Sequence, residues 1–328
     1  RRIGPAAFLD YDHLTPAGAR LTADVLLESG LLPDAEAAPA VLSRALRDDR
    51  SPAADGVRAW LAAREGPLPA DGARVLGMQL TAADAELRRA AAWALEHAHG
   101  GAALETDALV HALREDPSNG VRAAAAQALG TLGASARGPV PWLLDALGDP
   151  SEAVRHEAAR ALSALHLAAE DVPRLTAALA SPDDYVAAFA AWSLGNLGTE
   201  ARTAVPALAR ALAREKTDAV VSGALARIGP GAVDAVPVLV GFLETGSPDR
   251  RWRAARTLGR IGPPAVAAVP ALTAAVGDPE SLVRLHAVRA LGRVGPAARP
   301  AAAVLQRATG DPDDGVRREA RQALDRLH

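Results

Sequence analysis

Cysteine is absent from this chain of 328 residues, and aromatic residues make up only 3% of it. Without cysteine, the chain has no disulfide, no Cys-ligated metal and no thiol redox site. With so few aromatic side chains, small apolar residues must form the core, and each helix buries little area. No uninterrupted apolar run reaches the roughly 18 to 20 residues of a membrane helix. We therefore expect stability to come from many similar small interfaces, and we expect no membrane span.

Catalytic and metal-binding patterns are also lacking. The sequence contains no Walker A, G-x-S-x-G or H-E-x-x-H pattern, and His97, His99 and His111 have no carboxylate or fourth ligand at a metal-site spacing. We therefore predict no metal and no cofactor.

Basic and acidic residues are nearly equal in number, with 36 Lys or Arg and 39 Asp or Glu. The net charge of −3 disfavours nucleic acid as a partner. The distribution is uneven, because residues 245–328 hold 14 Arg against 8 Asp or Glu. The C-terminal part of the chain is therefore the basic part.

What the chain does have is a repeat. A leucine returns every 31 to 34 residues, late in an Ala-rich segment. Prolines at the start of the preceding helical segment and Asp-Pro pairs keep step with it, which predicts helix, tight turn, helix in every repeat of a solenoid. These anchor leucines are Leu95, Leu129, Leu162, Leu194, Leu225, Leu258, Leu291 and Leu324.

Nine helix pairs are predicted from residue 36. Their second helices are expected near 52–65, 84–98, 119–132, 152–166, 183–197, 217–228, 249–261, 280–294 and 313–327. Positions eight, four and one before the anchor leucine are mostly Val or Ala, which marks the buried face. Paired glycines such as Gly259 and Gly262 are expected to end these helices in the left-handed conformation. An Asp six residues before each Val-Arg arginine can cap the helix and pair with an arginine of its own or a neighbouring repeat.

The recurring Asp-Pro, Val-Arg, Ala-Ala and Ala-Leu-Gly elements resemble HEAT repeats, in particular the short HEAT-like variety also found in phycobilin lyases. The resemblance is regular over 84–328 and less regular over 36–83. It implies an all-α, right-handed α-solenoid whose second helices line a concave binding surface. It implies no reaction.

Residues that depart from the repeat consensus on the second helices are the candidate binding residues, because packing constrains the others. Two places before or two places after the anchor leucines, the chain offers two tryptophans and a C-terminal series of arginines, and Arg253 precedes Arg256 and Arg260 on the same predicted helix. Three interpretations of the arginines remain open: a solvated helix face, a site for an acidic protein segment, or a site for a phosphate backbone. The tryptophans are either partner anchors or packing between repeats. These candidates are Trp93, Trp192, Arg253, Arg256, Arg260, Arg289, Arg293 and Arg326.

The first 35 residues do not follow the repeat. The run from Phe8 to Gly18, with Asp10 and His13 separated by two residues, resembles the closing segment of SGNH (GDSL-type) hydrolases. That resemblance implies a histidine base and an orienting aspartate, whose nucleophilic serine would lie upstream of this chain. The alternative is a chance Asp/His pair before a capping helix with Thr15 as its N-cap.

The sequence therefore predicts two parts, an N-terminal segment 1–35 and a repeat array 36–328. We expect a non-catalytic, monomeric scaffold that binds a protein or an acidic peptide segment on the concave face. The alternative is the recruitment module of a larger SGNH-type esterase or acyltransferase. A chromophore lyase or chaperone is a further alternative that rests on the repeat alone. No compartment is predicted.

Overall fold

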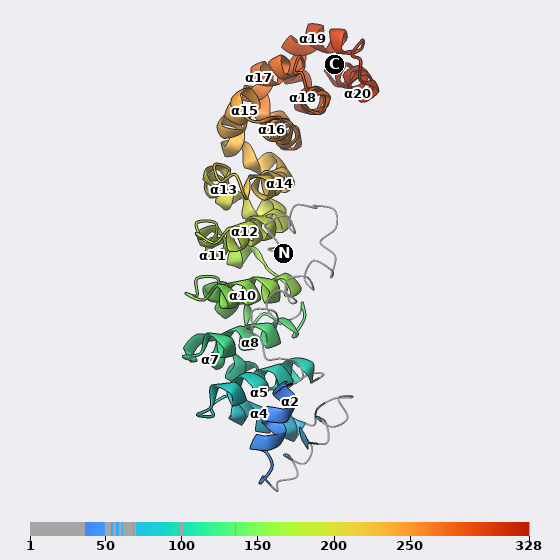
Figure 1. Cartoon of the computed structure of the whole chain (residues 1–328). Coiled ribbons are helices and arrows are strands. Elements are labelled where there is room, and N and C mark those ends of the chain that lie inside the picture. Colours follow the sequence, from blue (N-terminus) through green and yellow to red (C-terminus); the bar gives the residue numbers. More distant parts are fainter. Residues whose placement is uncertain are drawn as a thin grey trace. The chain divides into compact units, whose positions relative to one another are not determined.

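The computed structural model describes residues 37–49, 54, 57–58, 61, 68, 70–98, 101–134 and 136–327. All regular elements in these ranges are helices (Figure 1). The chain divides into two compact units, Arg1–Arg174 and Leu175–His328, and each is described by itself.

The first unit alternates first and second helices. Each second helix packs on the first helix of its own pair and on the second helix of the next pair. The described elements are α2 (Ala37–Ala45), α4 (Ala70–Gln79), α5 (Ala85–His97), α6 (Gly101–Leu104), α7 (Thr106–Glu115), α8 (Asn119–Gly130), α9 (Val140–Ala146), α10 (Glu152–Ala164) and the 3-10 helix η2 (Ala169–Asp171).

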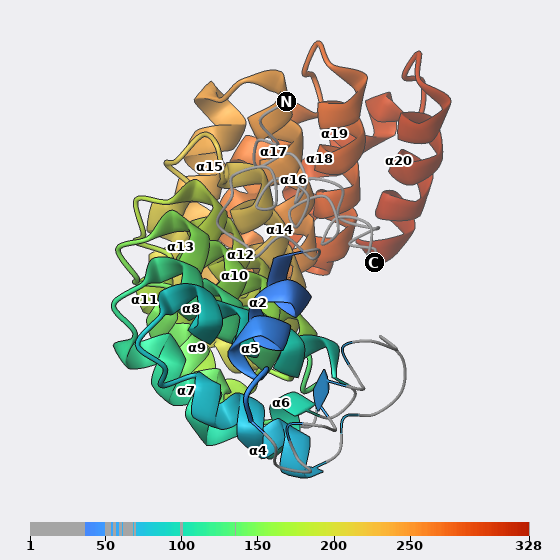
Figure 2. The same cartoon turned by 60° about the horizontal axis from the view of Figure 1, so that its bottom comes forward.

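The second unit has the same pairing, with a 3-10 turn in front of most first helices. The second helices α12, α14, α16, α18 and α20 form one layer, in which each contacts the next (Figure 2). The elements are α11 (Val172–Ala178), α12 (Asp184–Leu197), η3 (Gly198–Ala204), α13 (Val205–Ala211), α14 (Asp218–Ile228), η4 (Gly229–Ala235), α15 (Val236–Thr245), α16 (Pro248–Ile261), η5 (Pro263–Ala268), α17 (Val269–Ala275), α18 (Ser281–Val294), η6 (Gly295–Ala301), α19 (Ala302–Ala308) and α20 (Asp314–Arg326).

These elements confirm the predicted α-solenoid. Each second helix predicted from residue 84 onward is present, and its ends differ from the prediction by at most two residues. The anchor leucines from Leu95 to Leu291 are fully buried, as the repeat requires. Leu324 is only half-buried, and α20 is the last helix that the structure describes.

The paired glycines have two different roles, which corrects the expectation that both end the helix. Gly262 has a φ of 73° at the C-cap of α16, in the left-handed region that favours glycine. Gly259 lies inside α16, where a Cβ would be only 3.0 Å from the Cα of Ala290. Glycine at this position therefore lets α16 and α18 approach closely.

An arginine clamp joins neighbouring repeats and settles the role of the Asp-Pro motif. Arg284 of α18 donates from Nε and Nη2 to the carboxylate of Asp311 in the next repeat, at 2.9 and 3.0 Å. Its Nη1 donates to the main-chain oxygens of Asp278 and Pro279 in its own repeat, both at 3.0 Å. The same pairing recurs as Arg88 with Asp116, Arg122 with Asp149, and Arg251 with Asp278. The aspartate thus pairs with the neighbouring repeat's arginine, and the contact within a repeat runs through main-chain carbonyls.

One stretch of this unit, Asp218–Thr245, is long and apolar enough to cross a membrane by length and composition alone. In the structure it is two helices, α14 and α15, separated by a 3-10 turn that starts at Gly229 with a φ of 68°. α14 packs between α12 and α16, so its apolar residues belong to the helix–helix core.

Candidate functional site

The face of the second helices opposite the anchor leucines carries the residues that vary between repeats, and we call it the varied face. Its members lie two places before, two places after and five places before each anchor leucine, so they share one side of a helix. All the predicted binding residues lie on this face of α5, α12, α16, α18 and α20.

The two tryptophans are half-buried, and each contacts an aromatic ring on its own helix. Trp93 on α5 stacks on His97, with ring centroids 4.4 Å apart and planes at 28°. Trp192 on α12 lies against the buried Phe189, with centroids 6.4 Å apart. Both rings therefore keep an exposed part while being held in place by local packing. They belong to different compact units.

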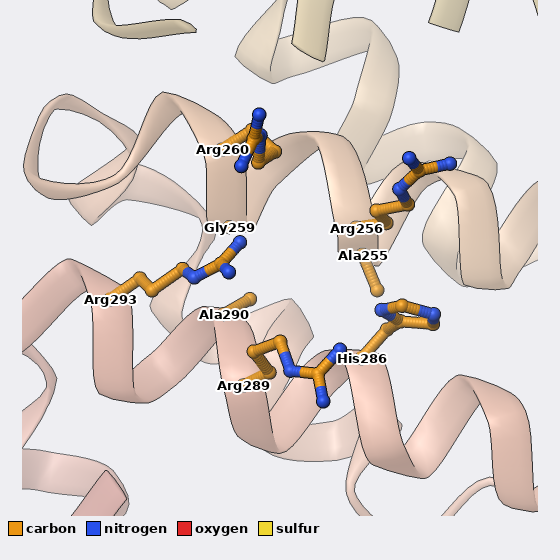
Figure 3. A pocket seen from close by; sticks show the side chains of 8 residues that line it. All are labelled: Ala255, Arg256, Gly259, Arg260, His286, Arg289, Ala290 and Arg293. Atoms are coloured by element: carbon orange, nitrogen blue, oxygen red, sulfur yellow. The ribbon is translucent and has the colours of Figure 1, made fainter. Parts of the chain in front are cut away.

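The arginines of α16 and α18 surround a hollow of about 160 Å³ (Figure 3). Its floor is made of small residues, Ala255 and Gly259 of α16 and Ala290 of α18, where a Cβ on Gly259 would lie 3.0 Å from the Cα of Ala290. The longer side chains at its rim are Arg256, Arg260, His286, Arg289 and Arg293. The hollow exists because small residues line the helix contact while long ones flank it.

Two of the predicted arginines are already engaged by carboxylates, a detail that the sequence analysis missed. Arg253 lies 3.4 Å from the carboxylate of Asp218, which is buried and also accepts from Arg250 at 2.6 Å. Arg289 donates to Glu319 of α20 at 2.6 Å. The hydrogen bond from Arg289 is the main cause that lowers the pKa of Glu319.

The sequence contains a sign that Asp218 takes part in an unusual ion pair. Seven places before the anchor leucine, most repeats carry the clamp arginine, whereas α14 carries Asp218 and α12 carries Ala187. Arg214 compensates at α12, because it donates to the main-chain oxygen of Ser181 and to the carboxylate of Asp184. An acidic residue where most repeats have the clamp arginine therefore indicates that the ion pair at this position has a different partner.

The other rim arginines have no carboxylate partner. Arg256, Arg260 and Arg293 are exposed, and none makes an ion pair or hydrogen bond with the residues described in 175–327. Partial desolvation of the guanidinium, followed by the charges of Arg260 and Arg289, lowers the pKa of Arg293. The site is thus a group of like charges at close range, and Glu319 is the nearby acid. Arg326, on α20, is exposed as well but does not line the hollow.

His286 is a further residue of this site that sequence reasoning did not select. Its ring stacks on Trp252, with centroids 5.6 Å apart, and its Nδ1 is buried without a hydrogen-bond partner. Burial lowers its pKa to about 4, and the charges of Arg289, Arg256 and Arg293 contribute. The imidazole is therefore neutral at pH 7.

The varied face of the first unit has a different character. Glu157 of α10 is fully buried and accepts from Arg160 at 2.7 Å, and burial raises its pKa. Gln127, on the varied face of α8, donates to Glu96 of α5 at 2.7 Å, and burial raises the pKa of Glu96 too. The unpaired basic character is therefore a property of the second unit's face.

Two further predictions concern other chemistry. Asp10 and His13, the proposed remnant of a hydrolase triad, lie outside the described residues. Among the residues that are described, no group of three or more His, Asp or Glu side chains could hold a metal ion.

Paired helices stacked through their second members, with an inter-repeat arginine clamp, define the class of α-solenoid repeat proteins. The family model described as HEAT repeats matches residues 73–140, 106–186, 140–229, 172–252 and 236–325. These matches cover most of the chain, so the chain belongs to the HEAT-repeat family.

Comparison with curated proteins gives no match. Among solved structures, the chain is similar to the complex of CpcE and CpcF of phycocyanin lyase from Nostoc sp. PCC7120, with 23% identity, 78% of this chain and 94% of that chain covered, and a TM-score of 0.38. It is also similar to an engineered protein of the Northeast Structural Genomics Consortium, with 24% identity, 78% and 96% covered, and a TM-score of 0.31. Both TM-scores are below 0.5, so neither likeness supports a functional argument.

Proposed function

We propose that the protein is a non-catalytic interaction scaffold that binds an acidic segment of a partner protein on the varied face of α16, α18 and α20. The observation that carries the proposal is the set of exposed guanidiniums of Arg256, Arg260 and Arg293, which have no carboxylate partner among the described residues. By contrast, the clamp arginines Arg251 and Arg284 of the same helices are matched by Asp278 and Asp311.

Like charges held together with fewer counter-charges than the group carries destabilise the folded chain. A side chain whose only role is solubility does not need to line a hollow together with other arginines, and glutamine would serve at lower electrostatic cost. An incoming carboxylate-rich segment would supply the missing counter-charge and form charge-assisted hydrogen bonds with the guanidinium forks. This supports an acidic ligand over a merely solvated face.

Trp93 and Trp192 are proposed as apolar anchors, each for a partner segment seated on its own unit. A half-exposed tryptophan held by local packing offers a large contact area at small entropic cost. Their different units make them separate test sites: Trp192→Ala should weaken a partner seated on the second unit, and Trp93→Ala should not.

The test uses the whole chain and a fluorescent decapeptide of glutamates, with binding followed by fluorescence anisotropy at low salt. The triple variant Arg256→Ser, Arg260→Ser, Arg293→Ser should lose at least tenfold in affinity. The matched control removes the same charge from exposed arginines of α19 and α20 that do not line the hollow, as Arg307→Ser, Arg318→Ser, Arg321→Ser. Equal losses in the two triple variants would reduce the effect to net charge and refute the site.

A further inference from the structure

The hollow between α16 and α18 has features that point to a more specific ligand than a run of carboxylates. We propose that it is a binding site for a phosphoryl group carried by a phosphorylated side chain of the partner, an inference that rests on the proposed function. The group would sit over Ala255, Gly259 and Ala290, with the guanidiniums of Arg256, Arg260 and Arg293 around it.

The size of the hollow fits such a group. About 160 Å³ is well above the roughly 10–15 Å³ that one ordered water requires. The small floor residues leave this space open, and the arginines rise from both helices on either side of it (Figure 3). A tetrahedral group entering between the helices would therefore meet donors from two elements.

Charge and donor count favour phosphoryl over carboxylate. A carboxylate carries one charge and two oxygens, which one guanidinium fork can satisfy. A phosphomonoester carries a charge of about −1.5 to −2 at pH 7 and three strong acceptor oxygens. Three unpaired guanidiniums from α16 and α18 exceed what one carboxylate can neutralise, whereas a single phosphoryl group can accept from all of them.

The surroundings argue for a protein ligand over a nucleic-acid backbone. Base stacking needs free aromatic faces. The nearby ring, Trp252, is already covered by His286 on one side, and the guanidinium of Arg253 lies 5.7 Å from its centroid. The indole N–H of Trp252 donates to Asp249 at 3.2 Å, so the ring is held in this position and is not free to stack on a base.

The neutral His286 provides a local reporter. Its pKa of about 4 results from burial and from the charges of Arg289, Arg256 and Arg293. An anion in the hollow would offset those charges, and the pKa of His286 would rise. An anion bound elsewhere on the chain would leave it unchanged.

The experiment compares three capped pentapeptides by anisotropy and calorimetry: glutamates flanking phosphoserine, the same peptide with glutamate in the centre, and the same with serine. Wild type should bind the phosphorylated peptide at least tenfold more tightly than the glutamate peptide. Arg260→Gln and Arg293→Gln should each remove most of this preference while retaining weak binding of the glutamate peptide. Arg318→Gln, an exposed arginine outside the hollow, should keep the preference.

A proton NMR titration of the imidazoles, with His286→Gln to assign the signal, should show an upward shift in the pKa of His286 with the phosphorylated peptide. Inorganic phosphate at millimolar concentration should produce the same shift, which shows that the phosphoryl group itself is recognised.

The outcomes separate the two proposals. Equal affinity for the phosphorylated and glutamate peptides would overturn the phosphoryl site and leave the acidic-segment scaffold standing. Binding of none of the peptides would overturn both. A third outcome would also overturn the phosphopeptide site. Wild type would bind single-stranded RNA or phosphatidylserine vesicles more tightly than the phosphorylated peptide, and Arg293→Gln would lose that binding. The ligand would then be that other source of phosphate.

Discussion

Removal of the clamp arginine of α18 should destabilise the array far more than removal of an arginine from the varied face. In Arg284→Ala, the protein loses the two hydrogen bonds to Asp311 at 2.9 and 3.0 Å and the two to main-chain oxygens at 3.0 Å. The side chains of Arg284 and Asp311 are only 13% and 9% exposed, so the carboxylate would remain buried without its partner. Breaking a buried pair in this way costs about 3 to 5 kcal/mol. Because both side chains keep some exposure, we expect a loss of about 3 kcal/mol in the free energy of unfolding.

The assay is urea unfolding of the whole chain followed by circular dichroism at 222 nm, supported by amide exchange of α18 and α20. Repeat arrays unfold by segments, so exchange should show the loss concentrated at the α18–α20 interface. Arg284→Lys should recover little of the loss, because a lysine cannot reproduce the planar fork. The matched control is Arg256→Ala, an exposed arginine with no partner in the described part of the chain, with an expected change within about 0.5 kcal/mol.

A loss below about 1 kcal/mol in Arg284→Ala, or one equal to that of Arg256→Ala, would refute the clamp as a source of stability. The pH dependence provides a second check. Burial alone would raise the pKa of Asp311. The hydrogen bond from Arg284, together with the other contacts of this carboxylate, outweighs burial, so the pKa lies below its ordinary value. The contribution of this pair is therefore full at neutral pH and is lost as the pH falls through that depressed pKa. Arg284→Ala should flatten this acid loss.

Three further predictions concern the core, the helix contact and the histidine. Leu291→Ala should cost about 2 to 5 kcal/mol in urea unfolding, because the side chain is fully buried; a cost below 1 kcal/mol would contradict its role as an anchor. Gly259→Ala should cost about 1 to 3 kcal/mol, since the new Cβ would lie 3.0 Å from the Cα of Ala290; unchanged melting would show that the helices can separate freely. His286 should titrate near pH 4 by NMR in the free protein, so folding stability should fall as the pH drops from about 6.5 towards 4; a normal midpoint in the folded chain would remove the repulsion on which the site argument depends.

Much of the fold was predictable from the repeat. Leu258 and its equivalents fixed the helix phase, and the alanines one and four places before them fixed the buried face, because a helical period leaves one choice of inward side. The role of Gly259 was not predictable. Both glycines of a pair look like helix ends in sequence, and only the approach of Ala290 separates the one that permits packing from the one with positive φ.

For the candidate site, the sequence offered the arginine positions but neither their pairing nor the presence of His286 among them. The arginine positions on α16, α18 and α20 follow from the repeat, and their common face follows from the helix period. Sequence spacing could not tell that Arg289 meets Glu319 or that Arg253 meets Asp218, because both contacts cross from one repeat to another.

The amino-acid sequence by itself determined a stacked array of helix pairs, the buried stripe and the residues left free to vary. These depend on local periodicity, which every repeat restates. The tertiary structure decided which arginines of the varied face pair with a carboxylate. It also decided that a neutral histidine lies among them and that small residues leave a hollow between α16 and α18. Those properties depend on distances between side chains some 30 residues apart, where a shift of a few ångströms decides between an ion pair and an unpaired charge.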